Sequence, residues 1–177
     1  KKIKFDDAFF KIISSPNHSN KKWVTEQFDQ MVMGDTIERS GTNAAVVRIH
    51  GKEKAIAVTV DSSANYCKSH PLSGGKQIVC ESWRNLVAVG AKPIAITNCL
   101  NFGNPENPEI MGQFAENILG IKEACEFLNY PVVSGNVSFY NGTNNNNIYP
   151  TPVIGGVGLI KSINKVKNHR FKNLNNQ

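Results

Sequence analysis

The feature that most constrains the fold is an alternation of helical and strand patterns over residues 74–133. Apolar residues recur at helical spacing over residues 74–89 and again from Pro108 to about Leu128. Each helical pattern is followed by an apolar strand pattern, first Ile94 to Leu100 and then Pro131 to Val133. Elements that alternate in this way build a sheet with helices layered on it. The sequence therefore predicts an α/β domain.

Two further strand patterns precede the alternation and one follows it. Residues 44–50 and 54–60 are rich in β-branched residues, and the Gly51-Lys52-Glu53 segment between them suits a hairpin. Residues 151–160 form a last strand that contains three glycines. Because a hairpin is antiparallel while helix-linked strands favour parallel pairing, the expected sheet is mixed. Short helices are expected near the N-terminus, at 6–13 and 23–33.

Polar residues follow three of the predicted strands. Asp61 ends the first, residues 97–105 (TNCLNFGNP) follow the second, and residues 134–138 (SGNVS) follow the third. In α/β proteins ligands bind beyond the carboxyl ends of strands. Asn can give a neutral oxygen to Mg²⁺ and Ser a hydroxyl to a phosphate. Taken singly, however, loops of Gly, Asn and Ser are more often ordinary turns than sites.

Charge and cysteine content argue against several classes of protein. The net charge is +6, but residues 161–177 carry five basic side chains and no acidic ones, and residues 12–160 sum to −1. A nucleic-acid-binding face of interleaved basic and aromatic residues is therefore not indicated. The four cysteines lack metal-ligand spacing and indicate thiols in a reducing cytoplasm. No apolar run is long enough to span a membrane.

Several motifs resemble one known family. Residues 95–106 (AITNCLNFGNPE) and 131–141 (PVVSGNVSFYN) are similar to the second half of the large, synthetase subunit of phosphoribosylformylglycinamidine synthase. Shorter matches lie at 74–77, 83–86 and 150–155, and the resemblance runs in the same order over about residues 22–161. The combination of LNFGNPE with SGNVS is specific to this family.

The resemblance implies a fold and a reaction. The implied fold is that of an aminoimidazole-ribonucleotide-synthetase N-terminal domain, with a mixed β-sheet layered with α-helices. The implied enzyme is a cytoplasmic ligase of purine biosynthesis that converts formylglycinamide ribonucleotide, ATP and glutamine-derived ammonia to the amidine, with Mg²⁺. The implied partners are a glutaminase subunit, a small bridging subunit and the remaining domains of the same chain.

The resemblance also implies roles for particular residues. Asn98 and Gly135 match ATP-binding positions, Asn136 matches a magnesium ligand, and Ser138 matches a substrate-binding position. No catalytic residue is expected here, because the catalytic histidines of the family lie in the other half. This sequence departs from the family at three places. The family usually has an acid at Asn98 or beside it, an aspartate where this chain has Asn43, and often a Pro-Arg pair before the tyrosine, which residues 63–67 (SANYC) lack.

The expected organisation is an N-terminal flank with a short helix (1–21), a synthetase-like domain (22–161) and a basic polar tail (162–177) that leads to a further domain. The expected assembly of such a piece is a homodimer. Two other functions stay open: a structural or nucleotide-scaffold domain without its own catalytic role, and another enzyme of the same superfamily, such as a thiamine-phosphate kinase-like enzyme. The Thr42-Asn43 sequence argues against the second, which relies on acidic pairs for metals.

Overall fold

The computed structural model describes residues 3–39, 41–144 and 146–169. The chain forms two compact units, Lys1–Val32 and Met33–Gln177, which are described separately. The boundaries expected from the sequence, at residues 21 and 161, stay predictions.

The first unit is helical. It contains α1 (Phe5–Ile13), a 3₁₀ turn (Pro16–His18) and α2 (Lys22–Thr25). The prediction of α1 is confirmed. The prediction of a helix over 23–33 is wrong beyond Thr25, because Oδ1 of Asp29 accepts a hydrogen bond from the backbone N–H of Met31 at 2.8 Å. Such a bond competes with the helical pattern, and Met33 then takes a left-handed φ of 62°.

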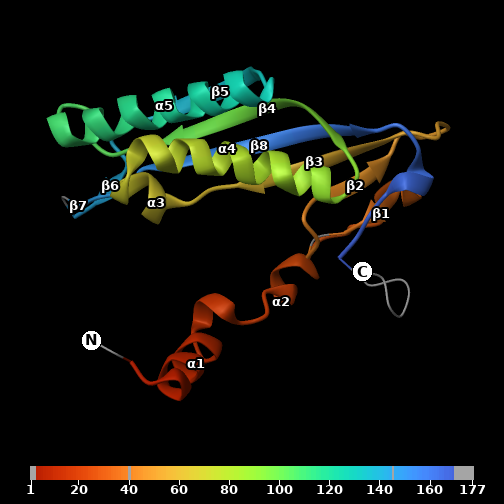
Figure 1. Cartoon of the computed structure of the whole chain (residues 1–177), viewed down its shortest axis with the longest axis horizontal. Helices are drawn as coiled ribbons and strands as arrows, with labels where there is room; N and C mark the ends of the chain where they lie inside the picture. Colours follow the sequence, from red (N-terminus) through yellow and green to blue (C-terminus); the bar gives the residue numbers. More distant parts are fainter. Residues whose placement is uncertain (1–2, 40, 145, 170–177) are drawn as a thin grey trace. The chain divides into compact units, whose positions relative to one another are not determined.

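The second unit is built on a six-stranded mixed sheet, as predicted (Figure 1). The strand order is β1-β2-β3-β8-β4-β5, and β6 and β7 form a separate two-stranded ribbon. The strands are β1 (Thr36–Glu38), β2 (Ala45–Arg48), β3 (Ala55–Asp61), β4 (Lys92–Asn101), β5 (Val132–Ser138), β6 (Gly142–Thr143), β7 (Asn146–Asn147) and β8 (Thr151–Ile160). The predicted β2–β3 hairpin is confirmed by antiparallel pairing, with Gly51 at φ 68° in the turn.

Strand directions bring three strand ends together. β8 pairs antiparallel with β3 on one side and with β4 on the other, and β4 pairs parallel with β5. β3, β4 and β5 therefore point the same way. Their carboxyl ends, at Asp61, Asn101 and Ser138, lie at the same end of the sheet, which is where α/β folds place ligands.

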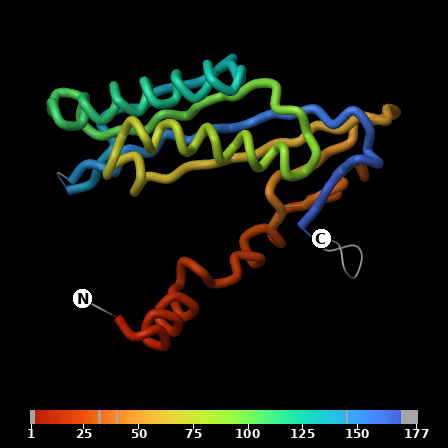
Figure 2. The backbone as a smooth tube through the Cα atoms, in the orientation of Figure 1, coloured from red at the N-terminus to blue at the C-terminus, as the bar shows by residue number. Residues whose placement is uncertain are grey.

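Three helices accompany the sheet: α3 (Ala64–Ser69), α4 (Pro71–Ala88) and α5 (Pro108–Leu128). The two long ones, α4 and α5, lie side by side along the sheet, as the backbone trace shows (Figure 2). Along β3 the residues Ala55, Ala57, Thr59 and Asp61 are buried, while Ile56, Val58 and Val60 between them are exposed. Alternation of this kind shows that the helices cover one face of the sheet and that the other face is open within the second unit.

Local signals set the helix ends. Oδ1 of Asn107 accepts a hydrogen bond from the N–H of Glu109 at 2.9 Å, so Asn107 is the N-cap of α5. Gly90 follows α4 with a left-handed φ of 86°, a conformation that glycine adopts without steric cost. The Ser- and Asn-rich segment 62–73, whose composition favours a loop, is instead largely occupied by α3 and the first turn of α4. Pro71 is the first residue of α4, a position where its missing N–H costs nothing.

Candidate functional site

The four residues expected to bind ligands lie on one pair of strands. In the parallel β4–β5 pair, Asn98 is opposite Gly135, Cys99 is opposite Asn136, and Asn101 is opposite Ser138. The prediction that 134–138 form a loop is wrong, since this segment is the carboxyl half of β5. The residues that looked separate in the sequence are therefore neighbours near one end of the sheet.

The same register divides these residues between the two faces of the sheet. Asn98 is also opposite the buried Ile154 of β8 and lines a cavity beneath α5, so its side chain and the adjacent Gly135 belong to the helix-covered face. Side chains alternate along a strand. Asn136 and Ser138 therefore face the open side. β5 is an edge strand of the sheet, and all seven of its residues are exposed. A ligand at this edge can therefore reach both faces of the sheet.

Gly135 gives the Asn98 side chain its position. A Cβ atom at residue 135 would collide with Oδ1 of Asn98. The glycine thus leaves the space that the amide occupies. Asn98 makes no side-chain hydrogen bond to the described part of the chain, so both its N–H₂ group and its carbonyl oxygen are available to a ligand.

Ser138 is held by a residue that the sequence analysis did not single out. The amide nitrogen of Asn141 donates to the hydroxyl of Ser138 at 3.1 Å, to the backbone carbonyl of Ser138 at 3.0 Å and to that of Phe102 at 3.0 Å. These bonds join the end of β5 to the segment that follows β4. The place of Asn141 at the end of the matched 131–141 motif is the signal that points to it.

Asn136 fits only part of a magnesium site. Its amide forms no hydrogen bond to any described residue, so its oxygen is free to bind a cation. However, within residues 3–39, 41–144 and 146–169 no three His, Cys, Asp or Glu side chains are grouped closely enough to hold a metal. Since Mg²⁺ takes six oxygen ligands, the others must come from phosphate, water or other protein segments.

Asp61 presents a second feature of the same sheet end. Its Oδ1 accepts a hydrogen bond from the amide of Asn85 at 2.8 Å, and Asn43 in turn donates to Oδ1 of Asn85 at 3.2 Å. Its Oδ2 is buried and has no hydrogen-bond partner among the described residues. Burial raises the pKa of this carboxyl above its ordinary value. The sequence placed Asp61 at a strand end but did not predict its contact with Asn85.

A buried hydroxyl network lies next to Asp61 on the same face. The hydroxyl of Ser82 on α4 lies 2.9 Å from that of Thr59 and 3.2 Å from that of Tyr130. All three oxygens surround Gly156 of β8, where a Cβ atom would collide with each of them. Burial raises the pKa of the Tyr130 hydroxyl, which keeps it protonated and able to donate.

The fold and the polar strand ends are those of a known family. Residues 41–160 match the family model for AIR synthase related protein, N-terminal domain, and the chain belongs to this family. Within this family, the chain is similar to proteins that share one enzyme name. The chain is 59% identical over 176 residues to phosphoribosylformylglycinamidine synthase subunit PurL of Pelagibacter ubique, and 55% identical over 166 residues to that of Azorhizobium caulinodans.

These alignments cover 99% and 94% of the chain but 24% and 23% of the two relatives. The chain thus spans about a quarter of the length of the relatives it matches. The resemblance expected from the motifs is confirmed.

Solved structures agree with the sequence matches. The structure of PurLQS from Thermotoga maritima is 37% identical with a TM-score of 0.78, over 84% of this chain and 25% of that chain. T. maritima PurL complexed with ATP has a TM-score of 0.70, and PurL complexed with FGAR a TM-score of 0.71. Both are 37% identical, over 80% of this chain and 23% of those chains. A ThiL complexed with AMPPCP and TMP, at 19% identity and a TM-score of 0.59, shares the fold.

The cysteines and the helices bear on the expectations of free thiols and of no membrane-spanning segment. All four cysteines are free thiols, with Cys67 and Cys125 buried. Among the described helices, none has the length and apolar character that crossing a bilayer requires.

Proposed function

We propose that this chain is the ATP- and substrate-facing α/β domain of a phosphoribosylformylglycinamidine synthase. This ligase converts formylglycinamide ribonucleotide, ATP and glutamine-derived ammonia to the amidine in purine biosynthesis. The observation that supports the proposal most strongly is the β4–β5 register, because it gathers Asn98, Gly135, Asn136 and Ser138 at one strand pair. The 59% identity to a PurL over almost the whole chain supports the same reaction.

The proposed roles follow from what each side chain can offer. In this reaction a phosphoryl group passes from ATP to the amide oxygen of the substrate, and ammonia then displaces that oxygen as phosphate. Mg²⁺ would neutralise the charge on the transferred group. Asn136 would supply one neutral oxygen to the cation, and the hydroxyl of Ser138, oriented by Asn141, would bind the substrate. Asn98 and Gly135 would contact ATP.

The role proposed for these residues is to bind and position ATP, Mg²⁺ and the substrate. Phosphoryl transfer depends mainly on holding the reacting groups in line and on stabilising charge. The chain spans only a quarter of its relatives, so the groups that act on the ammonia and the amide oxygen belong, in this proposal, to other segments. A glutaminase subunit and a small bridging subunit are the proposed partners, a proposal that the PurLQS structure from T. maritima supports. The four free thiols support a cytoplasmic location.

The test is made in the intact enzyme that contains this chain. Asn136→Ala and Ser138→Ala should each lower kcat/KM, by about 2–4 kcal/mol of transition-state binding if a cation or phosphate contact is lost. Thermal unfolding should stay unchanged, because both side chains are exposed. Ser134→Ala, on the same strand and the same face, is the matched control. The purified 177-residue chain alone should show no conversion of formylglycinamide ribonucleotide with ATP and ammonia.

If both variants fold normally and have wild-type kinetics, the domain is a structural or nucleotide-scaffold domain. Turnover by the isolated chain would also overturn the proposal, because it would place the complete catalytic apparatus within these 177 residues.

A further inference from the structure

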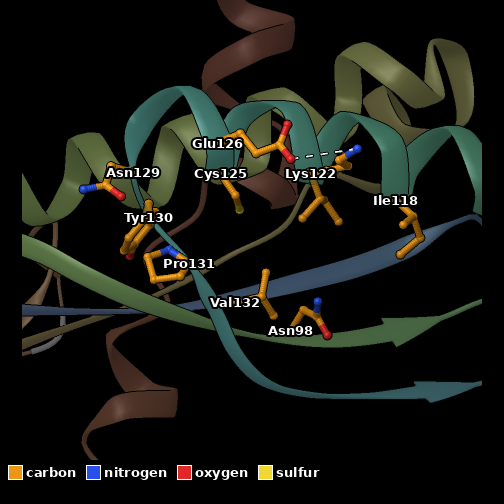
Figure 3. Close-up of a pocket in the computed structure, with 10 residues that line it drawn as sticks. Asn98, Ile118, Lys122, Cys125, Glu126, Asn129, Tyr130, Pro131 and Val132 are labelled. Carbon is orange, nitrogen blue, oxygen red and sulfur yellow. Dashed lines mark ion pairs between the residues drawn. The ribbon is translucent and has the colours of Figure 1, made fainter.

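The segment that leaves β5 contains a chemically labile pair of residues. It is separate from the cavity beneath α5, which belongs to the site described above because Asn98 lines it (Figure 3). Asn141 is the one asparagine of the chain that is followed by glycine, Gly142. The amide carbon of an asparagine can be attacked by the backbone nitrogen of the next residue, and glycine hinders this attack least because it has no Cβ.

The β6–β7 ribbon leaves the attacking nitrogen without a hydrogen-bond partner. The N–H of Ile148 donates to the backbone carbonyl of Asn141 at 3.1 Å, so these two residues form a hydrogen-bonded position of the ribbon. In an antiparallel pair such positions alternate with non-hydrogen-bonded ones. Gly142, opposite Asn147, therefore occupies a non-hydrogen-bonded position, and its N–H makes no bond to the described residues. Gly142 is also exposed, so water can reach it.

The contacts of the Asn141 side chain act on the reaction in two directions. The hydroxyl of Ser138 lies 3.3 Å from Oδ1 of Asn141, to which it can donate, and such a bond makes Cγ more open to attack. The bonds from the amide nitrogen to the carbonyls of Phe102 and Ser138, each at 3.0 Å, stabilise the asparagine and oppose the reaction. Because loss of ammonia is irreversible, a small population with the side chain turned toward Gly142 is enough for conversion.

We propose that Asn141-Gly142 is a self-modification site at which asparagine is converted to aspartate or isoaspartate. The Gly142 nitrogen loses its proton to water and forms a bond to Cγ of Asn141. The bond from Cγ to the amide nitrogen breaks, and that nitrogen takes up a proton and leaves as ammonia. Water then opens the cyclic imide at either carbonyl, which gives aspartate or, with an extra carbon in the backbone, isoaspartate. Nothing is oxidised or reduced, and water is the co-reactant.

The conversion undoes the contacts at the end of β5. A carboxylate only accepts hydrogen bonds, so the carbonyls of Phe102 and Ser138 lose their donor and face a negative charge. The segment after β4 is then no longer tied to β5, and the hydroxyl of Ser138 is no longer oriented by an amide. The chemistry of the site does not depend on the proposed function. Its effect on activity does, because Ser138 is the proposed substrate contact.

The test is a time course on the intact enzyme that contains this chain, in mildly alkaline buffer made with heavy-oxygen water. Peptide mass spectrometry should show that Asn141 takes up one heavy oxygen at least about tenfold faster than Asn144, which is followed by asparagine. Asn104 and Asn107 are internal controls. Each precedes a proline, which has no N–H, so both should stay unchanged. The heavy oxygen separates conversion in the enzyme from conversion during digestion.

A variant that carries the product tests the consequence. In Asn141→Asp, amide hydrogen exchange over residues 138–141 should be at least about tenfold faster than in the wild-type enzyme, because the bonds to the segment after β4 are lost. Asn144→Asp is the matched control. It adds the same charge to the same ribbon, at an exposed side chain that makes no hydrogen bond to the described residues.

The outcomes separate this inference from the proposed function. If Asn141 stays intact in the folded enzyme but is converted in urea, the fold protects it and the inference is refuted. Conversion of Asn144 as fast as that of Asn141 refutes it as well. If Asn141 is converted and kcat/KM falls with the converted fraction, both proposals gain support. If Asn141 is converted but Asn141→Asp keeps the wild-type kcat/KM, the modification site stands and the proposed role of Ser138 fails.

Discussion

Asp61→Asn is expected to stabilise the protein at neutral pH. The Asp61 side chain is only 9% exposed, and its Oδ2 has no partner among the described residues. Leaving a buried polar group unsatisfied costs about 1–3 kcal/mol, and more when the group is charged. An asparagine keeps the bond from Asn85, because its carbonyl oxygen can replace Oδ1, and it carries no charge. We therefore expect a gain of roughly 2 kcal/mol in the free energy of unfolding.

The gain should depend on pH with a definite sign. Burial raises the pKa of Asp61 in the folded state above its ordinary value, so folding disfavours the ionised form. Below the unfolded pKa both states are protonated and the penalty vanishes. As pH rises through the folded pKa, the wild-type protein loses stability and the variant does not. The difference between them should be small near pH 3.5 and complete at pH 7.

The assay is thermal and urea unfolding of both proteins between pH 3.5 and 7.5. For a chain of this length, a gain of roughly 2 kcal/mol corresponds to roughly 4–8 °C in Tm. Asp35→Asn is a control of opposite sign, because hydrogen bonds from Arg48 lower the pKa of Asp35. The Asp35→Asn variant should be less stable than the wild-type protein at neutral pH. This difference in stability should shrink as pH falls, because the wild-type protein then loses the stabilising contact. A destabilised Asp61→Asn protein, or a difference that does not change with pH, would refute the reasoning.

Two further predictions concern packing and assembly. Gly156→Ala should destabilise the domain by about 1–3 kcal/mol, because its methyl group would collide with the hydroxyls of Thr59, Ser82 and Tyr130. Urea unfolding measures this loss, and unchanged stability would show that the three hydroxyls can move aside. The chain should self-associate as a two-fold dimer through the open sheet face, where Val58 and Val60 are 39% and 75% exposed. Sedimentation at tens of micromolar tests this, and a monomer of 19.5 kDa with no concentration dependence would contradict it.

The sequence predicted the elements whose signal is local. The apolar stripes of α4 and α5 depend on neighbouring residues only, and both helices were found. β1 was missed because three residues form a strand only through their pairing with β2. The segment 134–138 was predicted as a loop because Ser, Gly and Asn favour turns, but pairing with β4 outweighs that preference.

The candidate site was predicted less completely than the fold. Motif resemblance identified Asn98, Gly135, Asn136 and Ser138, and the strand register brings them together. Which face each residue occupies depends on that register, since a shift of one residue reverses every side chain. The same limit applies to the Asp61–Asn85 bond, which joins a strand to a helix 24 residues away and has no local pattern.

The position of β8 has a consequence for how the protein is made. β8 is the last of the described strands along the chain, yet it lies between β3 and β4 and is hydrogen-bonded to both. On the ribosome, the β1–β3 part and the β4–β5 part are synthesised first and have no direct strand pairing to each other. The sheet is completed only when residues 151–160 emerge, and until then two inner strand edges stay unprotected. The nascent chain is therefore most vulnerable to misassembly in the interval between the synthesis of β5 and the insertion of β8.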